Sequence, residues 1–212
     1  MDNIINLESY QNNIRKDVIN AIIKNKIKPQ NILELGGGGG FTSSYLCKKY
    51  NCKATNIDIN IPENKSSNVK HIQLDISKEK IKSSVEKENF NLVLALDVVE
   101  HIVNTQKLIN SILEICSKGT YLFLSMPNIK NLRVPYEIYI KNSFPRKEQG
   151  IFDQTHLRWF TKNDINNLLK DNGFKLIKSY YTDHRSVLVN NRFIEKIFGS
   201  LFAPQFLVIG KF

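Results

Sequence analysis

The sequence has few cysteines and no long apolar run. Its three cysteines, Cys47, Cys52 and Cys116, are odd in number and show no CxxC spacing. This usage favours a reducing compartment and gives no support for a cysteine-based zinc site. No apolar run approaches the ~20 residues of a membrane-spanning helix, and the polar start Met1-Asp2-Asn3 is not typical of a signal peptide. We therefore expect a soluble, cytoplasmic protein.

Length indicates the number of domains, and charge bears on the kind of partner. A chain of 212 residues is typical of one domain, so we expect a single domain over 1–212. The formal net charge is +10, and residues 127–212 carry 14 Lys and Arg against 7 Asp and Glu. Two interpretations stay open, because this excess suits either an anionic partner or merely solvated lysine-rich faces.

Short apolar segments alternate with helical patterns along most of the chain. Strands are predicted at 31–35, 53–58, 69–74, 90–96, 120–125, 174–182 and 205–210. Helices are predicted at 9–27, 41–49, 76–88, 102–117, 161–172 (with Thr161 as N-cap) and near 187–198. Strands that are apolar on both faces and alternate with helices indicate an α/β fold with a parallel sheet covered on both sides. The weaker pattern of 128–160 favours an insertion or lid on the acceptor side, after the N-terminal helical segment of 1–29 and the first five strands.

Five consecutive glycines, Gly36–Gly40, separate the first predicted strand from the next helix. Such a run costs conformational entropy, and a tight turn alone needs only one or two glycines. A ligand that approaches the backbone closely, with helix N–H groups facing it, explains the run. The spacing fits no GxGxxG dinucleotide fingerprint and is followed by no P-loop lysine. It fits GxGxG as Gly36, Gly38 and Gly40, preceded by Glu34.

Acidic motifs follow the glycine run, each at the end of a predicted strand. They are Asn56-Ile57-Asp58, Gln73-Leu74-Asp75-Ile76 and Leu96-Asp97-Val98-Val99-Glu100-His101. With Leu33-Glu34-Leu35 and the glycines, they resemble the class I S-adenosylmethionine (SAM)-dependent methyltransferases over roughly residues 30–180. The segment 152–161 is similar to one in surface-polysaccharide and ubiquinone-type methyltransferases. The resemblance implies a Rossmann-like, doubly wound, seven-stranded and mostly parallel sheet with helices on both faces.

The resemblance also implies SAM as the cofactor, with S-adenosylhomocysteine as the product. Glu34 would organise the glycine turn and the amino-acid end of SAM, and Asp58 would accept hydrogen bonds from the ribose hydroxyls. Asp75 resembles the acid that meets the adenine amino group, and Asp97 would lie near the methyl group. Capping of a following helix is the alternative interpretation of the last three acids. The predicted cofactor-binding residues are Glu34, Gly36, Gly38, Gly40, Asp58, Ile59, Asp75, Ile76 and Asp97.

A hydroxyl acceptor loses a proton on methylation, and His101 and His156 are the candidate bases. Together with Asp97 they form the predicted catalytic set. If the chain is helical there, Asp97, Glu100 and His101 project from one side. With His156 they resemble the metal site of small-RNA and ubiquinone-pathway O-methyltransferases, which would suit Mg, Mn or Zn. A metal-free base or positioning pair and a purely structural pair are the other interpretations. Our prediction names no metal, with these four residues as candidate ligands.

We predict methyl transfer from SAM to a hydroxyl of a small-molecule or sugar- or lipid-linked acceptor, an anionic one being suited to the basic second half. The alternatives are an RNA methyltransferase, for which the sequence offers no appended RNA-binding module, and a non-catalytic SAM-binding partner subunit. Aromatic and basic residues of the insertion suit either an acceptor wall or a solvated lid: Arg133, Tyr136, Tyr139, Lys141, Phe144, Arg146 and Lys147. A late apolar stripe suits either core packing or peripheral membrane contact: Phe193, Ile194, Ile197, Phe198, Leu201 and Phe202.

Overall fold

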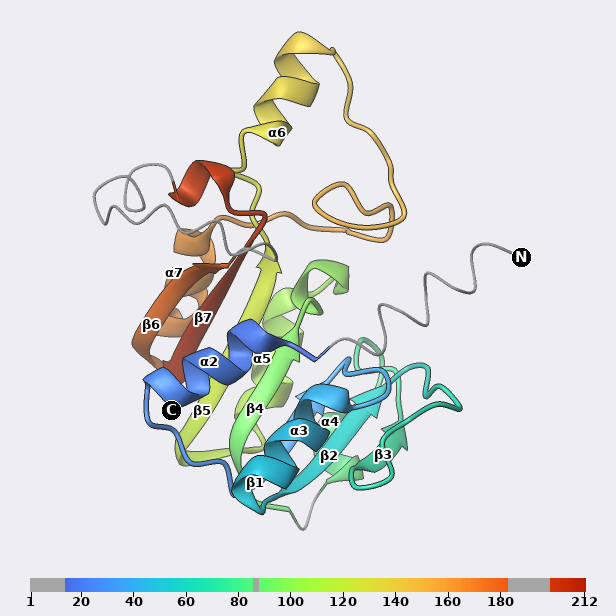
Figure 1. Ribbon diagram of the computed structural model, residues 1–212, viewed down its shortest axis with the longest axis vertical. Helices are drawn as coiled ribbons and strands as arrows, with labels where there is room; N and C mark the ends of the chain where they lie inside the picture. The colour runs from blue at the N-terminus through green and yellow to red at the C-terminus, as the bar shows by residue number, and fades with distance from the viewer. Residues whose placement is uncertain (1–13, 86–87, 183–198) are drawn as a thin grey trace. The chain divides into compact units, whose positions relative to one another are not determined.

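The computed structural model describes residues 14–85, 88–182 and 199–212, which form two compact units. Unit 1 comprises the described residues of Met1–Leu96, Asn104–Phe123 and Lys211–Phe212, and unit 2 those of Asp97–Val103 and Leu124–Gly210. Seven strands make one sheet in the order β3-β2-β1-β4-β5-β7-β6 (Figure 1). The chain reverses direction across the sheet between β1 and β4, as in doubly wound α/β folds. The predicted fold class is confirmed.

Unit 1 alternates strands and helices as the sequence pattern predicts. Its elements are α2 (Lys16–Lys24), β1 (Asn31–Leu35), α3 (Phe41–Tyr50), β2 (Lys53–Asp58), β3 (Lys70–Gln73), α4 (Ile81–Ser84), β4 (Phe90–Leu96), α5 (Thr105–Leu113) and the first part of β5 (Cys116–Pro127). The strands predicted at 31–35, 53–58 and 90–96 are confirmed to the residue. Of the helix predicted at 9–27, the structure contains α2, and residues 9–13 lie outside the described part.

Two helix predictions in unit 1 were too long. The segment predicted as helical from residue 76 forms a turn, and only α4 is helical. The Asp75 carboxylate accepts hydrogen bonds from the backbone N–H and hydroxyl of Ser77, and such local side-chain bonds compete with helix formation. The helix predicted at 102–117 is shorter as well, because β5 already begins at Cys116 and runs to Pro127 rather than spanning 120–125.

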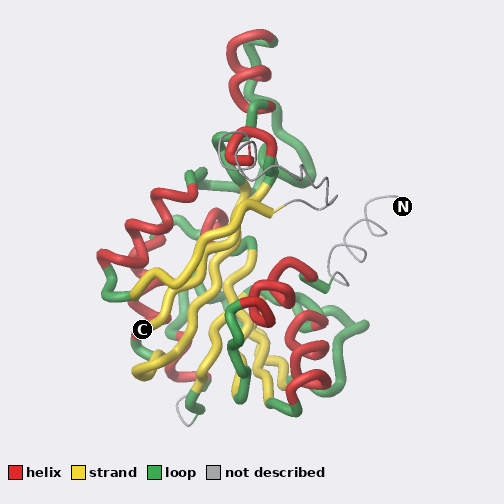
Figure 2. Tube along the Cα trace, turned by 60° about the vertical axis from the view of Figure 1, so that its left-hand side comes forward, coloured by secondary structure: helices red, strands yellow, loops and turns green. Residues whose placement is uncertain are grey.

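Parallel pairing brings the ends of the strands of unit 1 together. β1 lies between β2 and β4, and β2 pairs with β3, all in parallel. The register places Leu35 opposite Ile57, so the chain leaves β1 and β2 at the same edge. Residues 32–35 of β1 are all buried, as expected for a central strand of a parallel sheet, and they include the charged residue Glu34. Figure 2 shows these strands and the red helices beside them.

Unit 2 contains the later elements. They are η1 (Val99–His101), the rest of β5, α6 (Arg133–Pro135), the π-helical turn η2 (Tyr136–Ile140), α7 (Lys162–Asp171), β6 (Lys175–Thr182) and β7 (Gln205–Lys211), whose last residue is assigned to unit 1. Thr161 caps α7 in a capping box with Asp164, as predicted. The segment 128–160 contains the helical arm of α6 and η2, and a small core of Val134, Ile151 and Phe152. The helix predicted near 187–198 lies outside the described residues.

Among residues 14–85, 88–182 and 199–212, the structure contains no helix that is long and apolar enough to cross a membrane.

A buried carboxyl group links β1 to α3. The side chain of Glu34 is buried, and its Oε2 accepts hydrogen bonds from the hydroxyl (2.5 Å) and backbone N–H (3.3 Å) of Ser43. Ser43 lies in the first turn of α3, where backbone N–H groups have no partner within the helix. Because the N-cap residue Gly40 has no side chain, Glu34 supplies the acceptor from the strand instead. Burial raises the pKa of Glu34 to about 7.

The raised pKa predicts how Glu34 affects stability. A folded-state pKa of about 7 against an ordinary 4.5 gives stabilisation that is complete below pH 4.5 and is lost as the pH rises to about 7. Glu34→Gln cannot titrate but can still accept from Ser43. We expect the free energy of unfolding of the native protein, minus that of the variant, to fall by about 3 kcal/mol over this range. Urea unfolding at a series of pH values measures it, with Glu114→Gln as an exposed control. A constant difference would contradict the prediction.

Candidate functional site

Neighbouring positions of the glycine run require glycine for different steric reasons. Gly36, Gly38 and Gly40 have φ values of 69°, 53° and 68°, in the left-handed region that side chains rarely adopt. At Gly37, a Cβ atom would lie 2.5 Å from Asn56 Oδ1 and 2.6 Å from Glu34. Alternate residues therefore need the conformational freedom of glycine, and Gly37 has no room for a side chain.

Side chains of β2 hold this turn by hydrogen bonds to its backbone. The Gly38 N–H donates to Asp58 Oδ2 at 2.7 Å, and the Gly37 N–H donates to Asn56 Oδ1 at 3.1 Å. Asn56 Nδ2 donates in return to the Gly38 carbonyl at 2.7 Å. Asp58 is half-buried, and its Oδ1 also accepts from the Asn60 N–H. Because each carboxylate oxygen has two lone pairs, Asp58 keeps acceptor capacity for a ligand.

Sequence reasoning missed two residues of this network. Asn56 is fully buried, and its Nδ2 lies 3.3 Å from His71 Nδ1, while His71 Nε2 lies 2.9 Å from the Ser66 carbonyl. A Cβ atom on Gly40 would come within 3.1 Å of the His71 ring. The available signal for Asn56 was its position in the strand predicted at 53–58, two positions before Asp58 and therefore on the same face.

The other predicted cofactor residues of unit 1 have local contacts. Asp75 accepts from Ser77 and pairs with Lys78 Nζ at 2.8 Å, and the hydrogen bonds from Lys78 and Ser77 lower the pKa of Asp75 to about 2. These contacts stabilise the turn that follows β3. The side chain of Ile59 is exposed, and Ile76 is half-buried. The predicted adenine contacts of Asp75 and Ile76, and the role of Ile59, stay predictions.

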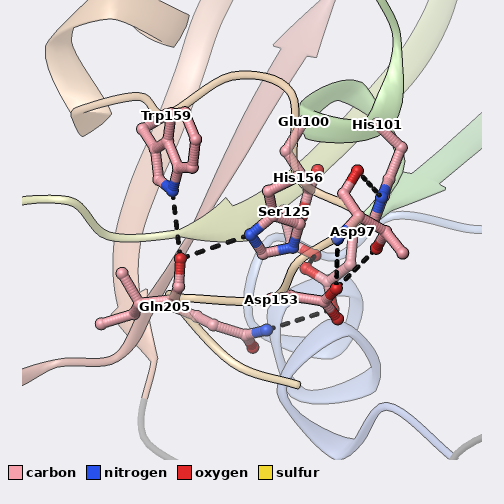
Figure 3. A network of polar contacts seen from close by, with 10 residues as sticks. Asp97, Glu100, His101, Ser125, Asp153, His156, Trp159 and Gln205 are labelled. Atoms are coloured by element: carbon pink, nitrogen blue, oxygen red, sulfur yellow. Dashed lines mark hydrogen bonds and ion pairs between the residues drawn. The ribbon is translucent and has the colours of Figure 1, made fainter. Parts of the chain in front are cut away.

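Asp97 follows β4 in a strained conformation. Its φ is 56°, which is uncommon for a residue with a side chain and often marks functional sites. Its carboxylate accepts from the Ser125 hydroxyl at 2.9 Å and from Gln205 Nε2 at 3.1 Å, as Figure 3 shows. Helical geometry begins only at Val99. The condition under which Asp97 would share one helix side with Glu100 and His101 is therefore not met, because the left-handed backbone of Asp97 lies outside the helical turn.

Glu100, His101 and His156 lie together in unit 2 (Figure 3). The two imidazole rings meet edge-on with their centroids 4.8 Å apart, and His156 Nε2 lies 4.0 Å from Glu100 Oε1. The Glu100 carbonyl accepts from the N–H groups of Leu157 and Arg158 at 2.9 and 3.1 Å. These two main-chain bonds hold the His156 segment against η1, although about 55 residues separate them in sequence.

The hydrogen bonds of the two imidazoles favour one tautomer. His101 Nδ1 lies 3.2 Å from the Thr155 carbonyl, and His156 Nδ1 lies 3.4 Å from the Ile151 carbonyl. Because a carbonyl oxygen only accepts, the neutral rings carry hydrogen on Nδ1 and leave Nε2 as the proton acceptor. Burial and the neighbouring His101 lower the pKa of His156, so its ring is neutral at physiological pH. His101 is half-buried and more accessible than His156.

This cluster has a donor set that suits a divalent ion. Within the described part of the chain, ligand atoms of Glu100, His101 and His156 lie within 4.8 Å of one another. Donor atoms that share one ion at about 2.0–2.4 Å lie at most about 4–5 Å apart, so the three residues fit it. Asp97 is not part of this group of candidate ligands. Its carboxylate instead accepts hydrogen bonds from Ser125 and Gln205.

Comparison with known proteins identifies the family. A family model described as a methyltransferase domain matches residues 7–179. A SAM-dependent methyltransferase from Archaeoglobus fulgidus has a similar structure, with 19% identity, a TM-score of 0.65 and 99% of each chain covered. Magnesium protoporphyrin IX methyltransferase from Synechocystis PCC 6803, solved with bound S-adenosylhomocysteine, is also similar. It has 16% sequence identity and a TM-score of 0.64, and the match covers 92% of this chain and 80% of that one.

A methyltransferase of different substrate shares the fold as well. It is 1,6-didemethyltoxoflavin-N1-methyltransferase from Burkholderia thailandensis, with 13% identity, a TM-score of 0.59 and coverage of 92% of this chain and 76% of that one. At such identities these structures demonstrate the fold, while the family model matches most of the chain. The glycine turn, the Asp58 contacts and the family match together place this chain in the class I SAM-dependent methyltransferase family.

Proposed function

We propose that this protein transfers a methyl group from SAM to a hydroxyl of a small-molecule or sugar- or lipid-linked acceptor. The observation that carries the hydroxyl assignment is the pair His101 and His156, each with Nδ1 against a carbonyl oxygen and Nε2 left to accept a proton. A hydroxyl needs such a base, because it must lose its proton as the oxygen–methyl bond forms. An amine that arrives neutral does not need one before transfer.

Unit 1 would hold SAM. Asp58 is placed to accept from the ribose hydroxyls while it keeps Gly38 in position. The side-chain-free turn lets a nucleoside approach the backbone closely. Asp75 remains the candidate for the adenine amino group, in exchange for part of its contact with Ser77 and Lys78. When bound, SAM supplies an electrophilic methyl group and leaves as S-adenosylhomocysteine.

Unit 2 would supply the base. We assign proton acceptance to His101 Nε2, because this ring is half-buried whereas the His156 side chain is only 5% exposed. His156 then acts as a positioning residue, whose neutral ring packs edge-on against His101 and avoids a second positive charge. Asp97 keeps its predicted role near the methyl group, held by Ser125 and Gln205. Glu100, His101 and His156 are the residues that would hold a divalent ion, which would lower the pKa of the acceptor hydroxyl.

An acceptor panel tests the proposed function. The purified protein is incubated with SAM and with nucleotide-linked sugars, polyprenyl-phosphate-linked sugars, simple phenols, simple amines or RNA, and S-adenosylhomocysteine is measured. We expect turnover with a hydroxyl acceptor, and preferentially with a phosphate-linked one, since residues 127–212 are basic. Turnover with amines alone would overturn the hydroxyl assignment, and turnover with RNA alone would favour the nucleic-acid alternative.

Asp58→Ala tests the nucleoside site independently of the acceptor. It removes both the proposed ribose contact and the acceptor of the Gly38 N–H. A hydrogen bond to a charged group contributes about 1.5–3 kcal/mol, so we expect SAM affinity to fall by about tenfold or more in isothermal titration. Asp171→Ala, which removes an exposed carboxylate of α7, is the matched control and should bind SAM as the native protein does. Unchanged affinity of Asp58→Ala would reject the ribose assignment.

His101→Ala tests the base. A positioned general base contributes about 10²–10⁴-fold, so we expect turnover of a hydroxyl acceptor to fall within that range while SAM affinity is retained. His156→Phe keeps an aromatic edge against His101 and should retain more turnover than His156→Ala, which a base role of His156 itself would not allow. Full turnover of His101→Ala would reject the assignment. We expect activity to persist with EDTA, and a loss that Mg²⁺ or Mn²⁺ restores would assign the cluster to a metal instead.

A further inference from the structure

The helical arm of unit 2 exposes an apolar surface to solvent. α6 and η2 form this arm, drawn in yellow in Figure 1. One side of the arm is packed, because Val134 is buried with Ile151 and Phe152, and Glu137 is also buried. Large apolar side chains lie exposed on either side of these buried positions in the helical sequence. We define the arm face as four of these exposed residues together with Phe202 from a later segment: Leu132, Tyr136, Tyr139, Ile140 and Phe202.

The arm face combines two segments of the chain. Leu132, Tyr136, Tyr139 and Ile140 are exposed, whereas Val134 and Glu137, which lie between them in the sequence, are buried. Tyr139 is 82% exposed and Ile140 71%. Phe202, 62% exposed, comes from beyond α7 and β6. Asn131 Nδ2 donates to the Phe202 carbonyl at 2.9 Å, and the Leu132 N–H donates to the Leu201 carbonyl at 2.7 Å. These bonds attach the second segment to the start of the arm.

Positive charge accompanies the arm face. Residues 129–143 contain Lys130, Arg133 and Lys141 against one acid, Glu137. Glu137 is buried and pairs with Lys141 at 3.4 Å, so it offers little negative potential to a partner. The Lys141 ammonium also lies 5.3 Å from the centre of the Tyr136 ring. The arm therefore presents aromatic and aliphatic groups together with exposed cations.

We propose that the arm face docks on an anionic lipid bilayer. Tyrosines favour the headgroup region, where the ring is apolar and the hydroxyl stays hydrated, and aliphatic side chains insert below it. Lys130 and Arg133 would lie in the negative potential of the headgroups, which attracts basic residues near the surface. A surface that unites exposed apolar side chains with cations and carries no exposed acid matches an anionic interface better than a neutral partner. The proposal does not depend on which acceptor is methylated.

Vesicle co-sedimentation of the full chain tests the apolar part. The vesicles are pure phosphatidylcholine or phosphatidylcholine mixed with phosphatidylglycerol. We expect binding to the mixed vesicles only, and a partition coefficient about tenfold lower for Tyr139→Ser/Ile140→Ser, which removes two of the largest exposed groups. Val103→Ser is the matched control, because Val103 is 68% exposed on another segment of unit 2. It should bind the vesicles as the native protein does.

A charge-reversal pair tests the electrostatic part. Arg133→Glu and Lys118→Glu change the net charge equally, and both side chains are exposed, but only Arg133 belongs to the arm. We expect Arg133→Glu to lower the partition coefficient about fivefold or more, and Lys118→Glu to lower it clearly less. Equal losses would show a general charge effect and overturn the arm assignment.

Two controls separate this proposal from its competitors. Isothermal titration with SAM verifies that each variant is folded and that vesicle binding is lost independently of cofactor binding. Sedimentation velocity without lipid examines the competing occupant, a second copy of this chain. The proposal would be overturned if the native protein were a dimer that Tyr139→Ser/Ile140→Ser dissociates. It would also be overturned if the native protein did not bind the anionic vesicles.

Discussion

The hydrogen bond from the Gly38 amide to Asp58 is the contact on which the shape of the glycine turn in unit 1 depends. A turn of five glycines has no side chains with which to hold itself, and three of its residues are left-handed. Its shape must therefore come from neighbours, and parallel pairing of β1 with β2 brings Asp58 and Asn56 to it. The residue proposed to bind the ribose is thus also the one that holds the turn, which couples the shape of the turn to ligand binding.

Main-chain contacts play the corresponding part in unit 2. Asp97 is left-handed, so the chain turns away from β4 before η1 begins. The Glu100 carbonyl then accepts two N–H groups of the segment that carries His156. These bonds involve no side chain of the histidines, which leaves both imidazoles to contact each other and the Thr155 and Ile151 carbonyls. The histidine pair is therefore positioned by backbone geometry.

Burial favours the uncharged form of a titratable group in both units. It raises the pKa of Glu34 to about 7 and lowers the pKa of His156. The physical cause is the same, because removing a charged group from water costs more than removing a neutral one. For Glu34 the consequence is a carboxyl group whose protonated form is favoured by burial, although its hydrogen bonds from Ser43 favour the charged form. For His156 it is a neutral ring beside the proposed base.

Local patterns determined much of the fold and the residues of the proposed cofactor site. Three strands of unit 1 were predicted to the residue, because short segments with apolar residues, bounded by glycine, proline and polar residues, mark the strands of a parallel sheet. Gly36, Gly38 and Asp58 could be recognised because their roles depend on spacing along the chain. Asn56 and His71 could not, since their function in the turn arises only when β1, β2 and β3 are aligned.

Tertiary structure alone decided the arrangement of unit 2. Sequence spacing suggested that Asp97, Glu100 and His101 share one helix side, but the left-handed backbone of Asp97 places its carboxylate with Ser125 and Gln205. The long helix predicted after β3 does not begin at residue 76, because the hydrogen bonds between Asp75 and Ser77 compete with the backbone hydrogen bonds of a helix. The sequence by itself thus determined the strands and the glycine turn, which follow from short-range patterns. Only the tertiary structure decided which polar groups meet, because those partners come from segments far apart in the chain.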